Sequence, residues 1–126
     1  MSSKHVRISR RNLMLAISRQ VGQRGTCPRA RVGCVIERDG RILAIGYNGS
    51  PPGMSHCDDV GCLMVNGHCT RTTHAEANAV AWSARVGAKL DGATLYTTGW
   101  SKGCCDTCQK LALSAGIVEI VTEVVH

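Results

Sequence analysis

A histidine, a glutamate and two cysteines are spaced in this sequence like the ligands and proton carrier of a zinc site. His74 and Glu76 are separated by one residue, and Cys105 and Cys108 by two. Imidazole and thiolate are ligands that zinc prefers, and a catalytic zinc keeps three protein ligands and one open position. The sequence therefore predicts a zinc held by His74, Cys105 and Cys108, with Glu76 free to move protons beside it.

Both halves of this group begin predicted helices, over 73–86 and 105–114. The dipole at the start of a helix favours the thiolate that zinc requires. Residues three apart share a helix face, so Cys105 and Cys108 can reach one ion. Cys104 is four residues before Cys108 and meets the same demand, so the spacing alone leaves Cys104 open as a ligand.

More metal-ligating residues gather in the long polar segment 46–71 and just before it. They are Cys27, Cys57, Cys62, His68 and Cys69. A loop of this length is uncommon in a compact domain unless it is functional or clamped. A second metal would clamp it, and simple free thiols are the alternative.

The other elements are predicted from periodicity and turn residues. In chain order we expect a helix over 9–23, a hairpin of strands 32–36 and 41–45 joined at Asp39-Gly40, the helix 73–86, a strand over 93–98, the helix 105–114 and a strand over 117–125. The expected apolar stripes are Leu13, Ile17 and Val21 in the first helix and Ala75, Ala79, Trp82 and Val86 in the second. This order predicts an α/β fold with a mixed sheet and helices on both faces.

Composition is typical of a globular intracellular protein. The 126 residues are predicted to form one domain, 1–126, with 44% apolar and 19% charged residues. Eight cysteines favour metal-bound thiols in a cytoplasmic protein, and no apolar run is long enough for a membrane span. The net charge of +6 suits a phosphate-bearing ligand, whereas 3% aromatic residues argue against a nucleic-acid platform.

Several stretches carry a resemblance to a known family. They are Thr26-Cys27 before Val32-Gly33, and the segments 46–51, 56–62, 67–72 and 74–79. In these stretches the chain resembles the phage and bacterial deoxycytidylate (dCMP) deaminases of the cytidine deaminase-like superfamily. The resemblance implies a three-layer α/β/α sandwich with a mixed central sheet of roughly four to five strands. It also implies hydrolysis of dCMP to dUMP and ammonia in pyrimidine deoxynucleotide metabolism, with His74, Cys105 and Cys108 on zinc and Glu76 as proton shuttle.

The same resemblance assigns ligands to a second, structural zinc. Cys27 and Cys57 match positions that hold this ion in many members of the family. Cys62 and Cys69 are predicted to complete the site, and His68 stays open as an alternative to them.

Substrate contacts are likewise implied. Asn48 stands where related deaminases hold the nucleotide sugar. Ala75, Arg31 and Arg71 are further predicted substrate contacts, the two arginines for phosphate, although solvated surface arginines are the alternative.

The segment Gly46-Tyr47-Asn48-Gly49 resembles the family's site for a regulatory triphosphate, dCTP as activator or dTTP as inhibitor, bound with Mg²⁺. A plain turn without ligand is the alternative. The family forms hexamers, so we expect a homo-oligomer, with Trp82 and Arg85 as candidate interface residues.

The chain departs from the family pattern in three places. Cys104 replaces a proline, the segment 99–104 is longer, and the sequence ends at His126, before the family's further helix and strand. The alternatives are a deaminase of another base or nucleotide (dCTP, methylated dCMP, cytidine, or adenosine in tRNA) and a non-catalytic, zinc-stabilised nucleotide-binding module.

Overall fold

The structure, a computed structural model, describes residues 4–100 and 103–124. Its elements in chain order are α1 (Arg10–Gly22), β1 (Gly33–Arg38), β2 (Arg41–Tyr47), α2 (Cys57–Val60), β3 (Met64–Val65), β4 (His68–Cys69), α3 (Ala75–Val86), β5 (Thr94–Thr98), α4 (Asp106–Ser114) and β6 (Glu119–Glu123). The predicted order is confirmed, except that the segment 46–71 also contains α2 and the short hairpin β3–β4. The end of the last predicted strand, Val125, lies outside the described residues. None of the helices in these ranges is long and apolar enough to cross a membrane.

The central sheet has four strands in the order β2-β1-β5-β6. Strand β1 is antiparallel to both β2 and β5, whereas β5 and β6 are parallel, so the sheet is mixed as predicted. The β1–β2 turn is at Asp39 and Gly40, whose φ values of 54° and 78° are both left-handed. A type I′ hairpin turn requires that conformation, which explains the Asp-Gly pair.

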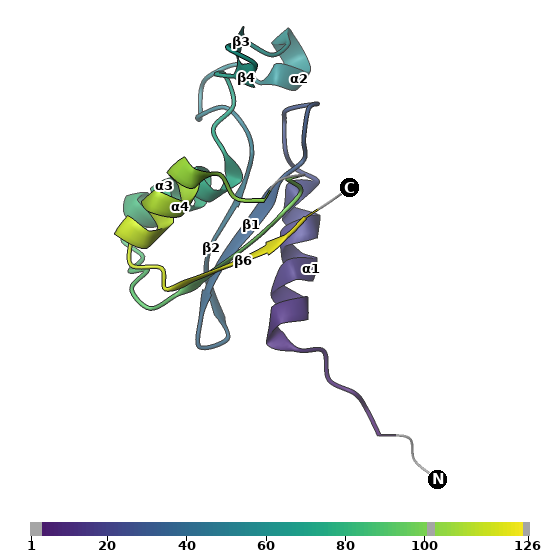
Figure 1. The fold of residues 1–126 in the computed structure, drawn as a ribbon, viewed down its shortest axis with the longest axis vertical. Coiled ribbons are helices and arrows are strands. Elements are labelled where there is room, and N and C mark those ends of the chain that lie inside the picture. The colour runs from purple at the N-terminus through teal and green to yellow at the C-terminus, as the bar shows by residue number, and fades with distance from the viewer. Residues whose placement is uncertain (1–3, 101–102, 125–126) are drawn as a thin grey trace.

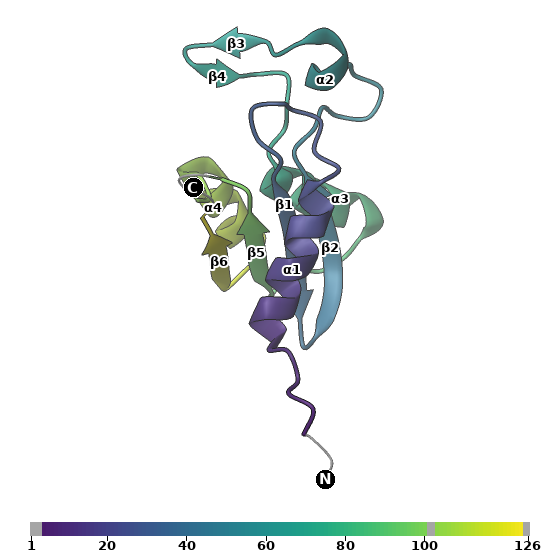
Figure 2. The ribbon, with the colours of Figure 1, turned by 90° about the vertical axis from the view of Figure 1, so that its right-hand side faces the viewer.

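Helices cover both faces of the sheet (Figure 1, Figure 2). On the α1 face, Met14 packs with Val35 and Tyr96. On the opposite face, Ile36 and Leu95 pack with small side chains of α3 and α4. Successive strand residues point to opposite faces, so neighbouring residues of β1 and β5 enter different cores. The three-layer α/β/α sandwich is confirmed.

The stripe predicted for α1 is only partly right, because Ile17 is half-buried and packs on the core of this face whereas Leu13 does not. Leu13 is 39% exposed. The buried residues of α1 are Met14, Leu15, Ser18 and Gly22. The reason is the close approach of α1 to β1, where a Cβ at Gly33 would collide with the backbone of Ser18. The small residues Ser18 and Gly22 therefore face the strand at the point of closest approach, and Leu13 lies outside the packed face.

The stripe predicted for α3 is only half right. Ala75 and Ala79 are fully buried, but Trp82 and Val86 are 50% and 54% exposed. A Cβ at Gly46 of β2 would collide with the Ala75 carbonyl oxygen. The start of α3 therefore packs on the sheet backbone itself, and its later residues remain at the surface.

Candidate active site

His74, Cys105 and Cys108 meet at the starts of two helices. His74 is the N-cap of α3, Cys105 is the N-cap of α4, and Cys108 lies in the first turn of α4. The His74 Nδ1 atom is 3.5 Å from the Cys105 Sγ and 3.4 Å from the Cys108 Sγ. All the ligand atoms of this group lie within 4.8 Å of one another. The structure thus assembles the predicted ligand set.

The chemistry of this group fits zinc. One imidazole and two thiols can fill three positions of a tetrahedral zinc and leave the fourth for water. Burial raises the pKa of the Cys108 thiol, and the nearby Glu76 carboxylate and Cys105 thiol raise it further. A divalent cation would reverse this shift, because metal binding stabilises the thiolate.

The Glu76 side chain is 1% exposed, and the two oxygens of its carboxylate differ in their hydrogen bonding. Its Oε1 atom accepts hydrogen bonds from the Thr97 hydroxyl at 2.7 Å and from the Trp100 indole N–H at 2.8 Å. Its Oε2 atom is buried and has no hydrogen-bond partner among the described residues. A buried carboxylate oxygen without a donor is destabilising, so Oε2 is suited to hold a proton or to face a reacting water.

A cavity of about 580 Å³ opens at the zinc-ligand group. Its walls include His74, Cys105, Asn48 and Trp100. The rings of Trp100 and His74 pack with centroids 4.8 Å apart and planes inclined by 51°. The volume is typical of a small-ligand site, mostly apolar with a few polar groups.

Asn48 lines this cavity, but its amide group is already engaged. The side-chain oxygen accepts from the Val32 N–H at 2.8 Å, and the side-chain nitrogen donates to the Ala30 carbonyl at 2.7 Å. Asn48 therefore fixes the loop before β1 at the cavity wall. Ala75, also predicted to contact substrate, is fully buried in the core and does not line the cavity.

The two arginines predicted to bind phosphate are engaged elsewhere. Arg31 forms an ion pair with Asp58 at 2.7 Å and donates to the Gly25 carbonyl. Arg71 donates to the Gly61 carbonyl at 3.0 Å. Neither lines the cavity, so their contact with phosphate stays a prediction without geometric support.

Among the cavity residues that sequence reasoning missed, Arg29 and Trp100 have the side chains best able to bind a ligand. The Arg29 guanidinium lies 3.5 Å from the Met64 sulfur and pairs with no carboxylate among the described residues. Nothing in the spacing separates Arg29 from Arg31. A signal for Trp100 did exist, since it is one of two tryptophans in the chain and stands two residues after the strand that leads to the zinc ligands.

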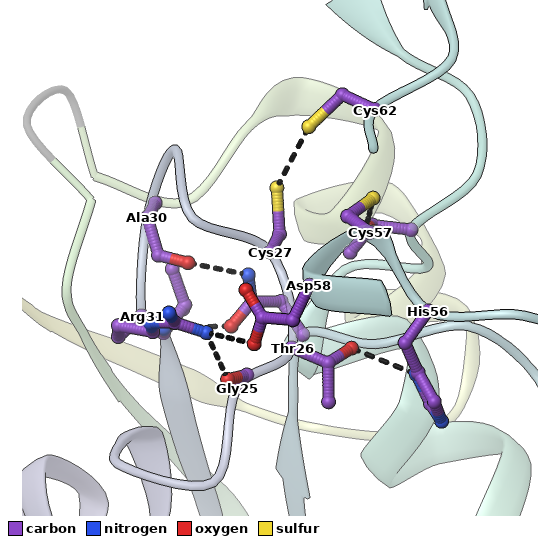
Figure 3. A network of polar contacts seen from close by, with 12 residues as sticks. Gly25, Thr26, Cys27, Ala30, Arg31, His56, Cys57, Asp58 and Cys62 are labelled. Carbon is purple, nitrogen blue, oxygen red and sulfur yellow. Dashed lines mark hydrogen bonds and ion pairs between the residues drawn. The ribbon is translucent and has the colours of Figure 1, made fainter. Parts of the chain in front are cut away.

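The four cysteines Cys27, Cys57, Cys62 and Cys69 form a second group, with all sulfurs within 4.8 Å of one another. The sulfurs of Cys27 and Cys62 are 3.8 Å apart, and those of Cys57 and Cys69 are 3.4 Å apart. Figure 3 shows the Cys27 and Cys62 side chains pointing toward each other. His68 is not a member of this group and lines the cavity instead.

Two thiols of this group differ in acidity. Burial raises the pKa of Cys62 to about 12, and hydrogen bonds with neighbouring thiols add to the effect. Burial also opposes ionisation of Cys69, but hydrogen bonds to the backbone at Thr72 and Arg71 outweigh it and lower its pKa to about 6. The backbone hydrogen bonds at Cys69 therefore favour its thiolate, which is the form in which a cysteine binds a metal ion.

The predicted effector segment borders a second, smaller cavity of about 380 Å³. Gly46, Tyr47 and Gly49 line it together with Trp82 and Arg85, whereas Asn48 does not. Gly46 is also required by packing, as its contact with α3 shows. Effector binding stays a prediction.

Cys104, the alternative ligand, lies beside the zinc-ligand group but outside it. Its thiol is 9% exposed, and its sulfur is 3.8 Å from the carbonyl oxygen of Cys105. Burial raises the pKa of this thiol to about 12. Part of the longer segment 99–104, residues 101–102, lies outside the described residues.

Comparison with known proteins identifies the family. Residues 8–124 match the cytidine and deoxycytidylate deaminase zinc-binding region. The chain is 46% identical over 111 residues to ComE operon protein 2 of Bacillus subtilis, covering 88% of this chain and 57% of that protein. It is 40% identical over 112 residues to the deoxycytidylate deaminase of Saccharomyces cerevisiae, covering 82% and 32%. The chain thus spans only about half or a third of these relatives.

A solved structure agrees with the sequence match. The dCMP deaminase of the cyanophage S-TIM5, crystallised with dCMP and dUMP, has a TM-score of 0.78 and 28% identity, covering 94% of this chain and 83% of that one. The resemblance seen in the sequence is confirmed. With the zinc-ligand triad, the buried glutamate and the α/β/α sheet in place, the chain belongs to the cytidine and deoxycytidylate deaminase family.

Proposed function

We propose that this protein is a zinc-dependent deaminase that hydrolyses dCMP to dUMP and ammonia. The observation that carries the proposal is the unpartnered, buried Oε2 atom of Glu76 beside the triad His74, Cys105 and Cys108. The cavity at this group has the size of a small-ligand site. The similarity to a dCMP deaminase crystallised with dCMP and dUMP supports the choice of substrate.

The reaction adds water at C4 of cytosine and breaks the bond from C4 to the exocyclic nitrogen. When bound, zinc supplies a Lewis acid that makes water a nucleophile at neutral pH. Glu76 takes a proton from the attacking water at Oε2 and passes it to the ring nitrogen next to C4. It then moves the proton of the new C4 hydroxyl to the departing amino group, as C4 becomes a carbonyl. The carboxylate returns to its ionised form, and the leaving group departs as ammonia.

Ammonia release from dCMP by the zinc-loaded protein tests this proposal. The panel should include dCTP, methylated dCMP, cytidine, deoxycytidine and adenosine. Preferred turnover of dCMP supports the proposal. Preferred turnover of another member reassigns the substrate, and absence of turnover on the whole panel favours the non-catalytic nucleotide-binding alternative.

Arg29 is expected to contact the substrate phosphate. It lines the cavity, and no carboxylate among the described residues neutralises it. A charge-assisted hydrogen bond is worth about 1.5–3 kcal/mol, so R29Q should raise the KM for dCMP by roughly ten- to hundredfold with little change in kcat. Steady-state kinetics on dCMP and on deoxycytidine, which has no phosphate, check this.

R41Q is the matched control for R29Q, because Arg41 begins β2 outside the cavity. The Arg29 assignment fails if R29Q and R41Q have the same KM for dCMP, or if R29Q weakens deoxycytidine binding equally.

The four-cysteine group is proposed to hold a second, structural zinc. With two ligand groups in the structure, fully loaded protein should contain close to two zinc ions per chain. H74A should lose one zinc and keep the segment 57–72 resistant to protease. C57A should lose the other zinc and expose that segment, because a closed structural site stabilises its own loop. Elemental analysis that finds one zinc or fewer in wild-type protein would reject the structural site.

We further propose regulation and assembly at the second cavity. Gly46, Tyr47 and Gly49 line this cavity with Arg85, whose guanidinium offers a cation to the phosphates of dCTP or dTTP with Mg²⁺. The half-exposed Trp82 beside it suits a homo-oligomeric contact, a hexamer by analogy with the family. A cytoplasmic location fits the free thiols.

A further inference from the structure

Two side chains hold one oxygen of Glu76 and leave the other free. Thr97 is at the end of β5 and is fully buried, and Trp100 lies in the segment that follows. Their donors are 2.7 Å and 2.8 Å from Glu76 Oε1, while Oε2 has no partner among the described residues. We propose that Thr97 and Trp100 are positioning residues that bind Oε1, so that every proton transfer passes through Oε2. This inference rests on the proposed function.

The two donors determine where a proton can sit on the carboxyl group. An indole N–H can only donate a hydrogen bond, so Trp100 cannot accept a proton from Glu76. If the carboxyl were protonated at Oε1, that proton would face two donors that need an acceptor. Protonation at Oε2 keeps both hydrogen bonds. Glu76 can therefore gain and lose the shuttled proton at Oε2 alone, and its side chain does not need to rotate between the two steps.

Trp100 also joins Glu76 to a zinc ligand. Its ring packs on the His74 ring at 4.8 Å and forms part of the cavity wall. Trp100 thus contacts both the Glu76 carboxylate and the His74 imidazole while it lines the cavity. Trp100 lies in the segment 99–104, which the family resemblance makes longer in this chain.

Substitutions that remove one donor each test the proposal. T97V keeps the size of the side chain and deletes the hydroxyl, whereas W100F keeps a smaller aromatic ring and deletes the N–H. Because a hydrogen bond to a charged group is worth about 1.5–3 kcal/mol, each should lower kcat for dCMP by about tenfold or more. The zinc content should change by less than about twofold in both variants, since neither residue belongs to the zinc-ligand group. The KM should change by less than about twofold in T97V, because Thr97 does not line the cavity.

Two further variants separate positioning from structure. T97S restores the hydroxyl and should recover most of the lost kcat. T98V is the matched control, because Thr98 is the next buried residue of the same strand and its hydroxyl bonds Glu123 at 3.2 Å. The inference is overturned if T97V and W100F keep wild-type kcat, or if T98V loses as much as T97V.

A spectroscopic readout tests the contact independently of turnover. In a W82F background Trp100 is the only tryptophan. Removing the Glu76 carboxylate by E76A should shift the Trp100 emission to shorter wavelength, because the hydrogen-bonded carboxylate stabilises the excited indole. Unchanged emission overturns the inference. A shift together with a wild-type protein that is inactive on dCMP instead counts against the proposed substrate alone.

Discussion

Replacing Glu76 by glutamine is expected to lower kcat for dCMP by roughly 10²–10⁴-fold, the usual loss when general acid–base catalysis is removed. The amide keeps the size of the side chain and can still accept from Thr97 and Trp100 through its carbonyl oxygen. It then presents an NH₂ group in place of Oε2 and cannot take a proton from water. The zinc content should stay at the wild-type value, because Glu76 is outside the ligand triad.

Glu37 offers the matched control for this substitution. It is a second buried glutamate, 4% exposed, and its oxygens bond the Tyr96 hydroxyl at 3.2 Å and the Gly40 N–H at 2.9 Å. Glu37 bonds Tyr96, which packs in the core on the α1 face, and Gly40 in the β1–β2 turn, so E37Q should retain activity in protein that is still folded. Turnover by E76Q within tenfold of wild type would reject the role of Glu76 as proton shuttle.

The meeting of His74, Cys105 and Cys108 could be predicted because zinc chemistry restricts both residue type and place. Few side chains bind zinc, and a histidine and two cysteines at predicted helix starts leave little freedom. Helix and strand order followed from periodicity and from the Asp39-Gly40 turn, whose left-handed conformation the structure shows. These are local properties of the chain, and the α/β/α architecture follows from their order.

Other features depend on contacts between distant segments, which the sequence does not display. The face of α1 that packs is determined by the close approach to Gly33, so a stripe chosen by hydrophobicity was wrong at Leu13. Which arginine is free for the cavity depends on Asp58, which pairs with Arg31 and leaves Arg29 without a carboxylate partner among the described residues. In each case, a residue remote in sequence determines which of several similar side chains is buried or paired.

The same distinction applies to Glu76. The His-x-Glu spacing identifies it as a candidate for proton transfer but says nothing of its two oxygens. Their difference arises from Thr97 and Trp100, which are 21 and 24 residues away in sequence. A catalytic group is thus found from its motif, whereas the residues that orient it are found only in the folded chain.

Substitution of the two adjacent cysteines should have opposite results. C105A removes a ligand of the predicted triad, so the protein should lose the catalytic zinc and its activity. The loss should exceed the ~10–100-fold typical of removing an outer partner of a metal site. C104A should keep the zinc and most of the activity, because its sulfur is outside the triad and 3.8 Å from the Cys105 carbonyl. Elemental analysis and dCMP turnover on both variants check this.

C104P adds a test of the helix entry. Proline is the residue that the family resemblance places at position 104. It fixes the φ angle of the residue before the N-cap Cys105 and has no backbone N–H to donate. The Cys104 carbonyl, which accepts from the Gln109 side chain at 2.7 Å, is kept by both C104A and C104P. Zinc and activity should therefore survive in both. If C104A loses the zinc while C105A retains it, α4 begins one residue earlier in the active protein and Cys104 replaces Cys105 as the ligand, which the four-residue spacing to Cys108 permits.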